Sequence, residues 1–229
     1  MANTSHQSQN LILYNYFRSS TSYRARCALN IKNLAFQYKP VHLINNGGEQ
    51  NSPEYRRINP LGGVPTLVHG DLIISQSYSI IEYLDAAFPQ TNPLFPKSPY
   101  ERAKVSQFCQ IINADMHGYG NLKTHQYLEK NFGMDNSAKE KFTSRFFTEG
   151  FEAMEAFVSE NGSTYSFGSS ITAADCFLVP VVFTAQRFKV PLEKFPKLMK
   201  INENLLSNSS FQKSHPFRQI DTPEELRIK

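Results

Sequence analysis

The hydrophobic positions of the first forty residues change spacing between that of strands and that of helices. Residues 11–14 form a short apolar run of strand length, polar residues 15–22 follow as a loop, and helical spacing then continues to residue 33. A second strand is expected over residues 36–41. The chain therefore begins as strand, helix, strand, and two strands joined through a helix are expected to be parallel.

The pattern then predicts a hairpin followed by a helix. Residues 64–68 have the composition of a strand, His69-Gly70-Asp71 indicates a turn, and residues 72–74 form the returning strand. Helical spacing resumes at Ser77 and continues to Phe88. The whole order is β-α-β-(α)-β-β-α, which predicts a thioredoxin-like α/β domain over residues 10–88. The polar segment before Leu11 is expected to be a disordered tail.

A proline-rich stretch separates this region from the rest of the chain. Residues 89–99 contain four prolines, a density that neither a helix nor an inner strand tolerates, so we expect the domain linker there. From residue 100 the spacing is helical throughout, which predicts an all-helical domain over residues 100–229. Three apolar stripes are expected to form its core: Val105, Phe108, Cys109 and Ile112; Phe147, Phe151, Met154 and Val158; and Phe177, Leu178, Val181, Val182 and Ala185.

Composition excludes several classes of function. The net charge of +4 is not concentrated in runs of Lys or Arg, so we expect no nucleic-acid partner. The three cysteines are widely spaced without a CxxC pair, which predicts neither a disulfide framework nor a metal site and fits a reducing compartment such as the cytoplasm. The longest apolar run, residues 176–183, is too short to span a membrane.

Hydroxyl residues lie where the first strand meets the first helix, at Ser19-Ser20-Thr21-Ser22. A helix start has unpaired backbone N–H groups and a partial positive charge, which stabilise a thiolate, and a serine hydroxyl can donate a hydrogen bond to it. Serine and threonine are also favoured as helix caps at sites that bind no ligand. From these residues alone, both interpretations stay open.

Two further segments are expected beside this loop. In Val64-Pro65-Thr66, a cis proline would turn the Val64 backbone outward to pair with a peptide ligand, whereas an ordinary trans proline would not. In Gln76-Ser77, the start of the next helix could hold a carboxylate, or Ser77 could simply cap it. The three segments would meet at one edge of the sheet, where together they could bind a γ-glutamyl tripeptide.

Several motifs resemble one known family. Residues 19–26 resemble the zeta-class glutathione transferase signature S-S-C-x-W-R-V-R, with Thr21 where the family has Cys and Tyr23 where it has Trp. The resemblance to these proteins, the maleylacetoacetate isomerases, covers nearly all of residues 11–229. Further segments carry it: Asn59-Pro60, residues 64–67, Gln76-Ser77, residues 80–84, 121–123, 172–175, 187–190 and 214–219.

The resemblance implies the glutathione transferase fold, α/β plus all-α, with glutathione as cofactor and a homodimeric, cytoplasmic enzyme. It implies catalytic roles for Arg18, Ser19, Ser20 and Arg187, and no metal. It also implies that a larger set binds glutathione or lies beside it: Ser19, Ser20, Thr21, Ser22, Tyr23, Arg24, Gln50, Val64, Gln76, Ser77, His117, Asn121 and Lys123.

The implied reaction is the cis–trans isomerisation of maleylacetoacetate to fumarylacetoacetate in tyrosine and phenylalanine breakdown. This small diketo substrate carries two carboxylates, which the forked guanidinium groups of Arg18 and Arg187 match, although a lone arginine is commonly a solvated surface residue. A maleylpyruvate isomerase or a general glutathione transferase would use the same site. A non-catalytic interaction module is disfavoured because Ser19, Gln76 and Ser77 are all present.

Asp175 and Cys27 are expected to serve the fold alone. Thr172-x-x-Asp175 has the form of a capping box, with Ile171 and Cys176 beside it, so we interpret Asp175 as part of a helix cap. Cys27 lies within the first helix and is expected to be packed in the core.

Overall fold

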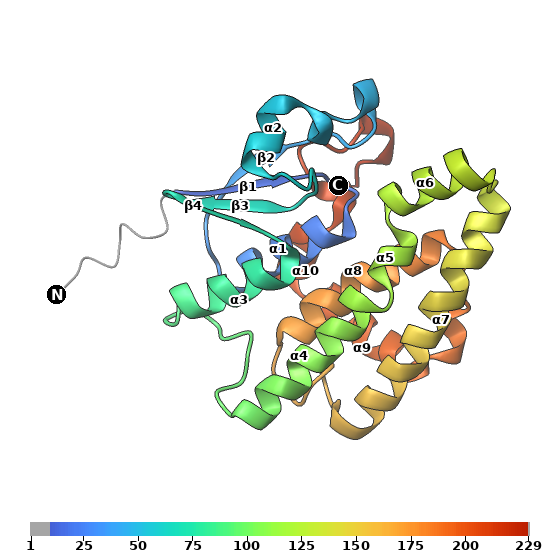
Figure 1. The fold of residues 1–229 in the computed structure, drawn as a ribbon. Helices are drawn as coiled ribbons and strands as arrows, with labels where there is room; N and C mark the ends of the chain where they lie inside the picture. The colour runs from blue at the N-terminus through green and yellow to red at the C-terminus, as the bar shows by residue number, and fades with distance from the viewer. Residues whose placement is uncertain (1–9, 229) are drawn as a thin grey trace. The chain divides into compact units, whose positions relative to one another are not determined.

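The computed structural model describes residues 10–228 and divides into two compact units. The first contains the chain up to Leu94 together with Ser209–Lys229, and the second contains Phe95–Asn208. Figure 1 shows the elements of both units by residue number. The expected disordered tail falls on residues 1–9, which lie outside the described residues.

The first unit is built on a four-stranded sheet with the order β2-β1-β3-β4. Strand β1 (Leu11–Asn15) pairs in parallel with β2 (Gln37–Pro40) and antiparallel with β3 (Thr66–His69), which pairs antiparallel with β4 (Leu72–Ser75). The parallel pair and the hairpin expected from the sequence are both confirmed.

Three helices accompany the sheet. Helices α1 (Ser20–Ile31) and α3 (Ser77–Ala87) pack against each other and lie on one face of the sheet, and the short α2 (Pro53–Ile58) lies on the other (Figure 1). Their inward residues, such as Leu29 and Ile81, are fully buried, as is Leu13 of β1. The arrangement confirms the expected thioredoxin-like domain.

The segment Ser209–Lys229 belongs to the first unit, although the sequence predicts a helical domain that continues to residue 229. Its helix α10 (Ser209–Ser214) packs on α1, with Phe211 fully buried. Asn30 donates a hydrogen bond to the Ser214 hydroxyl over 2.7 Å. Two 3₁₀ turns follow, Pro216–Arg218 and Glu224–Leu226. The helical core of the second unit therefore excludes this segment.

A buried ion pair anchors the proline-rich stretch to the first unit. The ammonium group of Lys32, at the end of α1, lies 3.2 Å from the Asp85 carboxylate of α3 and also donates to the Asn92 carbonyl. Asp85 accepts a hydrogen bond from the Leu94 amide over 2.7 Å. These bonds fix the stretch up to Leu94, where the division between the units falls.

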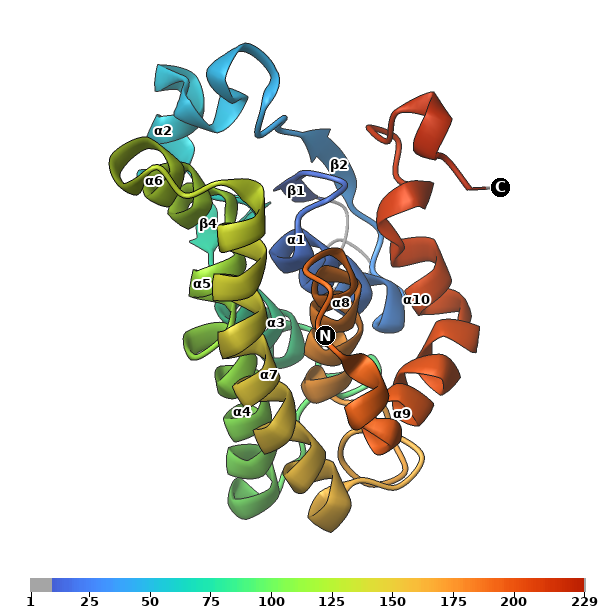
Figure 2. The same cartoon turned by 90° about the vertical axis from the view of Figure 1, so that its right-hand side faces the viewer.

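The second unit is helical. It contains α4 (Pro99–Ala114), α5 (His117–Gly120), α6 (Leu122–Phe132), α7 (Asn136–Asn161), α8 (Ala173–Arg187) and α9 (Pro196–Ser207). Helices α4 and α7 lie side by side, and α8 packs against both α4 and α9 (Figures 1 and 2). Every residue of the three apolar stripes expected from the sequence is buried, which confirms them as core.

The start of α8 forms a capping box. The fully buried Asp175 carboxylate accepts hydrogen bonds from the Thr172 amide over 2.8 Å and from the Ser166 amide over 2.9 Å. Burial raises the pKa of Asp175, although these hydrogen bonds act in the opposite direction. The expected role of Asp175 as a helix cap is confirmed. Helix α8 also contains Pro180 in its interior, a position that the sequence pattern alone would disfavour.

Candidate active site

Ser19 is the N-cap residue of α1. Its backbone is extended, and its hydroxyl oxygen accepts a hydrogen bond from the Ser22 amide over 3.2 Å. The capping interpretation of this serine is therefore confirmed. Ser19, Ser20 and Thr21 are each partly exposed, and the first turn of α1 contains no acidic residue. A partly accessible helix start without its own carboxylate is suited to an anionic ligand.

Thr21 joins the serine loop to the turn before β3. Its hydroxyl donates to the Val64 carbonyl over 2.8 Å and lies 2.9 Å from the Ser19 hydroxyl. A threonine hydroxyl has one proton, so Thr21 can only accept from Ser19. The Ser19 proton therefore points at Thr21 and must rotate away before it can serve a ligand.

The Val64–Pro65 peptide bond is cis, which is one of the two alternatives open from the sequence. The Val64 carbonyl is the acceptor for Thr21, so the turn and the serine loop are in direct contact. Val64 itself is partly exposed. The expected proximity of these two segments is confirmed.

The N-cap residue of α3 is Gln76, whereas one interpretation of the sequence had Ser77 as the cap. Gln76 has a positive φ of 74° and makes no side-chain capping bond. Such a backbone in a residue other than glycine costs about 1–3 kcal/mol and occurs most often at functional sites. Ser77 is 2% exposed, and its hydroxyl accepts from Arg24 over 3.3 Å.

The pairing of the strands brings the serine loop, Val64 and Gln76 to the same end of the sheet. Tyr14, near the end of β1, lies opposite Thr66, at the start of β3. Thr66 in turn lies opposite Ser75, at the end of β4. Gln76 directly follows Ser75, Val64 precedes Thr66 by two residues, and the serine loop begins five residues after Tyr14, so all three segments lie at the same end of the sheet.

Gln50 is held with an open acceptor. Its amide nitrogen donates to the Leu43 carbonyl over 3.1 Å, while its buried Oε1 accepts no hydrogen bond from any residue in 10–228. Gly48 has φ of +91°, which favours glycine, and a Cβ there would lie 2.3 Å from Gln50 Nε2, so a side chain at residue 48 would displace that of Gln50. A buried, unpaired oxygen fits a ligand that brings an N–H donor.

Three more of the expected glutathione-binding residues are buried, in addition to Ser77. Ser22 and Tyr23 are fully buried and Arg24 is 1% exposed. Arg24 reaches Ser77, so it links the first turns of α1 and α3. Ser22, Tyr23 and Arg24 therefore lie on the buried side of the serine loop, whereas the neighbouring Arg18 is exposed.

The candidate residues of the second unit lie around α5, α6 and the end of α8. Asn121 caps α6 by accepting from the Thr124 amide over 2.8 Å, and its amide nitrogen donates to the Gly118 carbonyl. His117 is partly exposed at the start of α5, and Lys123 is exposed on α6. Arg187 is the exposed last residue of α8, with its guanidinium 4.6 Å from the Phe188 ring.

His125 is a residue of this region to which the sequence assigns no role. Its Nε2 lies 2.8 Å from the Thr143 hydroxyl and 3.0 Å from the Tyr119 carbonyl, which ties α6 to α7. Its ring packs against Phe188, next to Arg187. Burial, together with the nearby Arg187 and Lys139, lowers the pKa of His125. A single histidine without metal-ligand spacing gives no signal from which this role could be read.

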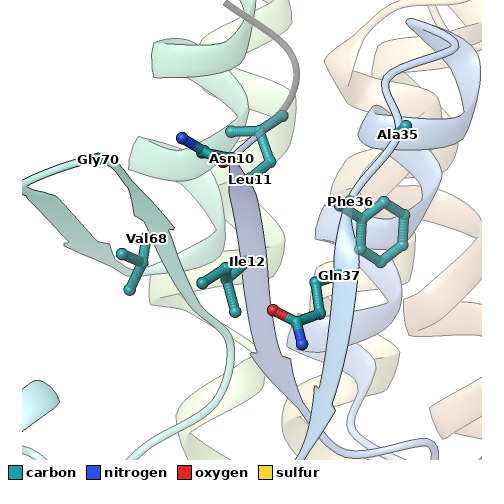
Figure 3. A pocket seen from close by; sticks show the side chains of 8 residues that line it. All are labelled: Asn10, Leu11, Ile12, Ala35, Phe36, Gln37, Val68 and Gly70. Carbon is teal, nitrogen blue, oxygen red and sulfur yellow. The ribbon is translucent and has the colours of Figure 1, made fainter.

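A hollow of about 570 Å³ lies at the opposite edge of the sheet from Ser19 (Figure 3). It is formed at the start of β1 and β2 and the end of β3, and no charged side chain lines it. We therefore do not assign the chemistry to it. Among residues 10–228 there is no cluster of metal-ligating side chains. No helix in the same range is long and apolar enough to cross a membrane.

Comparisons with known proteins agree with both units. Residues 13–92 match the family model of the glutathione S-transferase N-terminal domain, and residues 121–213 match that of the C-terminal domain. A curated maleylacetoacetate isomerase from Dictyostelium discoideum is 38% identical over 210 residues, which cover 92% of this chain and 95% of the relative.

Solved structures are similar over the same range. The holo structure of a maleylpyruvate isomerase, a bacterial zeta-class glutathione S-transferase, has 34% identity and a TM-score of 0.89, and covers 93% of this chain and 100% of that one. A maleylacetoacetate isomerase of Methylobacterium extorquens AM1, with bound malonate and glutathione, has 29% identity and a TM-score of 0.85, with 93% and 99% covered. The chain therefore belongs to the glutathione S-transferase family, in the zeta class with the maleylacetoacetate isomerases.

Proposed function

We propose that this protein is a glutathione-dependent cis–trans isomerase that converts maleylacetoacetate to fumarylacetoacetate. The observation that supports it best is the edge of the sheet at which Ser19, Thr21 and Val64 are joined by hydrogen bonds. The names of the relatives point to the same reaction. The pathway that this reaction serves would be tyrosine and phenylalanine breakdown.

The residues present fit glutathione. The open acceptor of Gln50 suits an N–H donor of the tripeptide, and the starts of α1 and α3 suit its charged and thiol groups. We propose Ser19, Ser20, Thr21, Gln50, Val64 and Gln76 as its contacts, together with the backbone N–H of the buried Ser77 at the start of α3. Ser22, Tyr23 and Arg24 would support them, because they are buried. His117, Asn121 and Lys123 are the candidates in the second unit.

Glutathione supplies a thiol that adds reversibly to the activated double bond, so that the bond can rotate before the thiol leaves. The chain's own residues prepare this step. The Ser19 hydroxyl and the start of α1 stabilise a thiolate at neutral pH. Arg18 and Arg187 would bind the substrate carboxylates, and charged donors near the keto oxygens would stabilise negative charge that develops there.

Maleylpyruvate is the alternative substrate, which the similarity to a maleylpyruvate isomerase favours. The test follows the loss of maleylacetoacetate and of maleylpyruvate with catalytic glutathione. We expect turnover of the first to exceed that of the second. Turnover of maleylpyruvate alone would reassign the substrate, and no turnover of either would leave a general transferase. Failure to bind immobilised glutathione would instead favour an interaction module.

We further propose a cytoplasmic homodimer. The edge strand β4 presents Leu72 and Ile73, which are 43% and 49% exposed within the single chain, and an edge with apolar residues is suited to association. Sedimentation equilibrium should give twice the 26.1 kDa chain mass. The single-chain mass at micromolar concentration would refute the dimer.

A further inference from the structure

The loop between β1 and α1 is fixed from behind by a fully buried cation. Arg26 of α1 donates from Nη1 to the Asn15 side chain over 3.0 Å and from Nη2 to the Phe17 carbonyl over 3.0 Å. Its Nε donates to the Ser214 carbonyl over 3.0 Å. Arg26 therefore bridges this loop and the end of α10, 188 residues further along the chain.

A carboxylate from the same distant segment holds the other side of the loop. Asp221 accepts a hydrogen bond from the Phe17 amide over 2.9 Å through Oδ2, and its Oδ1 accepts from the Tyr38 hydroxyl of β2. Burial lowers the pKa of Arg26, and the negative charge of Asp221 acts in the opposite direction because the two charges attract each other. The Phe17 residue thus has its N–H bound to Asp221 and its C=O bound to Arg26.

Asp221 and Arg26 together form a clamp on the Phe17 backbone, and this clamp lies next to the candidate site in the sequence. Phe17 is followed directly by Arg18 and Ser19, the residues to which the proposed function gives substrate and thiol binding. Asp221 lies after residue 213, where the second family model ends. A residue outside both matched domains therefore fixes the backbone beside the candidate catalytic serine.

We propose that Asp221 is a positioning residue of the active site, which sets the place of Arg18 and Ser19 by clamping the Phe17 backbone. This inference rests on the proposed function of Ser19. Displacements of about 1 Å in a catalytic group can reduce rates by about 10²-fold. Because Arg26 still holds the Phe17 carbonyl when Asp221 is lost, we expect a smaller effect, about tenfold in kcat/KM for glutathione.

The experiment compares four variants of the full chain. Asp221→Ala removes both acceptors. Asp221→Asn can keep both bonds, with its oxygen accepting from Phe17 and its amide donating to the Tyr38 oxygen, so it tests geometry against charge. Tyr38→Phe removes one bond and leaves the Phe17 bond intact. Glu225→Ala is the matched control, an exposed carboxylate four residues away in the same segment.

Three measurements are made on each variant: the pH profile of kcat/KM, the melting temperature, and amide hydrogen exchange of residues 16–23. We expect Asp221→Ala to lower kcat/KM about tenfold, to move the acid limb of the profile to higher pH, and to speed exchange at Phe17. Asp221→Asn, Tyr38→Phe and Glu225→Ala should stay within about threefold of wild type.

One result would overturn the proposal: Asp221→Ala lowers the melting temperature while the pH profile and the exchange of residues 16–23 stay at wild-type values. Asp221 would then serve only the fold. An equal loss in Asp221→Asn would also overturn it, since charge and not position would be responsible. If wild type isomerises neither substrate, the exchange measurement and calorimetric glutathione binding still test the clamp, so failure of the proposed function is distinguishable.

Discussion

Helices α1 and α8 both begin at a hydroxyl cap, but only α8 also has a buried carboxylate of its own at that start. At the start of α8, the fully buried Asp175 accepts from the Thr172 and Ser166 amides. At the start of α1, Ser19 caps the helix with a hydroxyl, and the first turn contains no acidic residue. The neighbouring Ser20 and Thr21 remain partly exposed.

The difference shows how a cap can be told from a binding site. A helix start that holds its own buried carboxylate has already satisfied its amides and its partial positive charge. A start that is capped only by a neutral hydroxyl keeps most of that charge, and can stabilise an anion brought by a ligand. Four substitutions test this comparison.

The largest effect on stability is expected at the start of α8, where Asp175 accepts from two amides. Asp175→Ala leaves the buried Thr172 and Ser166 amides without acceptors, and each unpaired amide costs about 1–3 kcal/mol. The free energy of unfolding should therefore fall by about 3–5 kcal/mol. Urea denaturation measures the loss. The folded fraction should keep wild-type KM for glutathione; a large rise in KM would place Asp175 in the binding site.

At the start of α1, Ser19→Ala should lower activity more than it lowers stability. Loss of the cap costs about 1 kcal/mol. The pKa of the bound thiol should rise by about one to two units, which reduces kcat/KM at neutral pH about 10- to 100-fold. The pH–rate profile checks it, with recovery expected at alkaline pH. An unaltered profile would mean that Ser19 only caps the helix.

Ser20→Asp gives α1 the carboxylate that α8 already has. Negative charge in the first turn should stabilise the helix by about 0.3–1 kcal/mol. The same charge should raise the pKa of the bound thiol by about one unit and weaken glutathione binding about tenfold. Titration calorimetry measures the affinity, and Ser20→Asn is the uncharged control. Equal affinity of the two variants would contradict the electrostatic account.

The smallest effect is expected at Thr21, where the chain departs from the zeta-class signature. Thr21→Val keeps the shape and removes the bonds to Val64 and Ser19, so KM for glutathione should rise about threefold to tenfold, in line with one or two hydrogen bonds. Thr21→Ser should restore it. Steady-state kinetics of both variants decide the point; equal KM values in Thr21→Val and wild type would show that the bridge is dispensable.

The sequence predicts the parts of the fold that follow from periodicity. Strand pairing, the hairpin and the buried stripes of α4, α7 and α8 agree with the structure, because alternation and helical spacing report which side of an element is buried. Periodicity does not report the partner of a buried face. For this reason the packing of α10 on α1 was not foreseen.

The candidate site was predictable in outline and not in detail. A hydroxyl-rich segment after a strand locates the helix start, and Ser19 caps it. Motif resemblance assigns ligand contact to whole segments, whereas Tyr23 and Arg24 lie inside the fold because the helix turns them inward. The clamp on Phe17 joins residues 204 positions apart, a contact that local pattern cannot reveal.

The placement of Ser209–Lys229 has a consequence for the order in which the chain folds. Arg26 finds its Ser214 acceptor only after 188 further residues have been made, so a ribosome must first release every residue of the helical unit. Closing so long a loop is slow compared with forming contacts within α4 to α9. The first unit therefore needs residues on both sides of the helical unit, and its serine loop gains the contacts of Ser214 and Asp221 only after Phe95–Asn208 have been made.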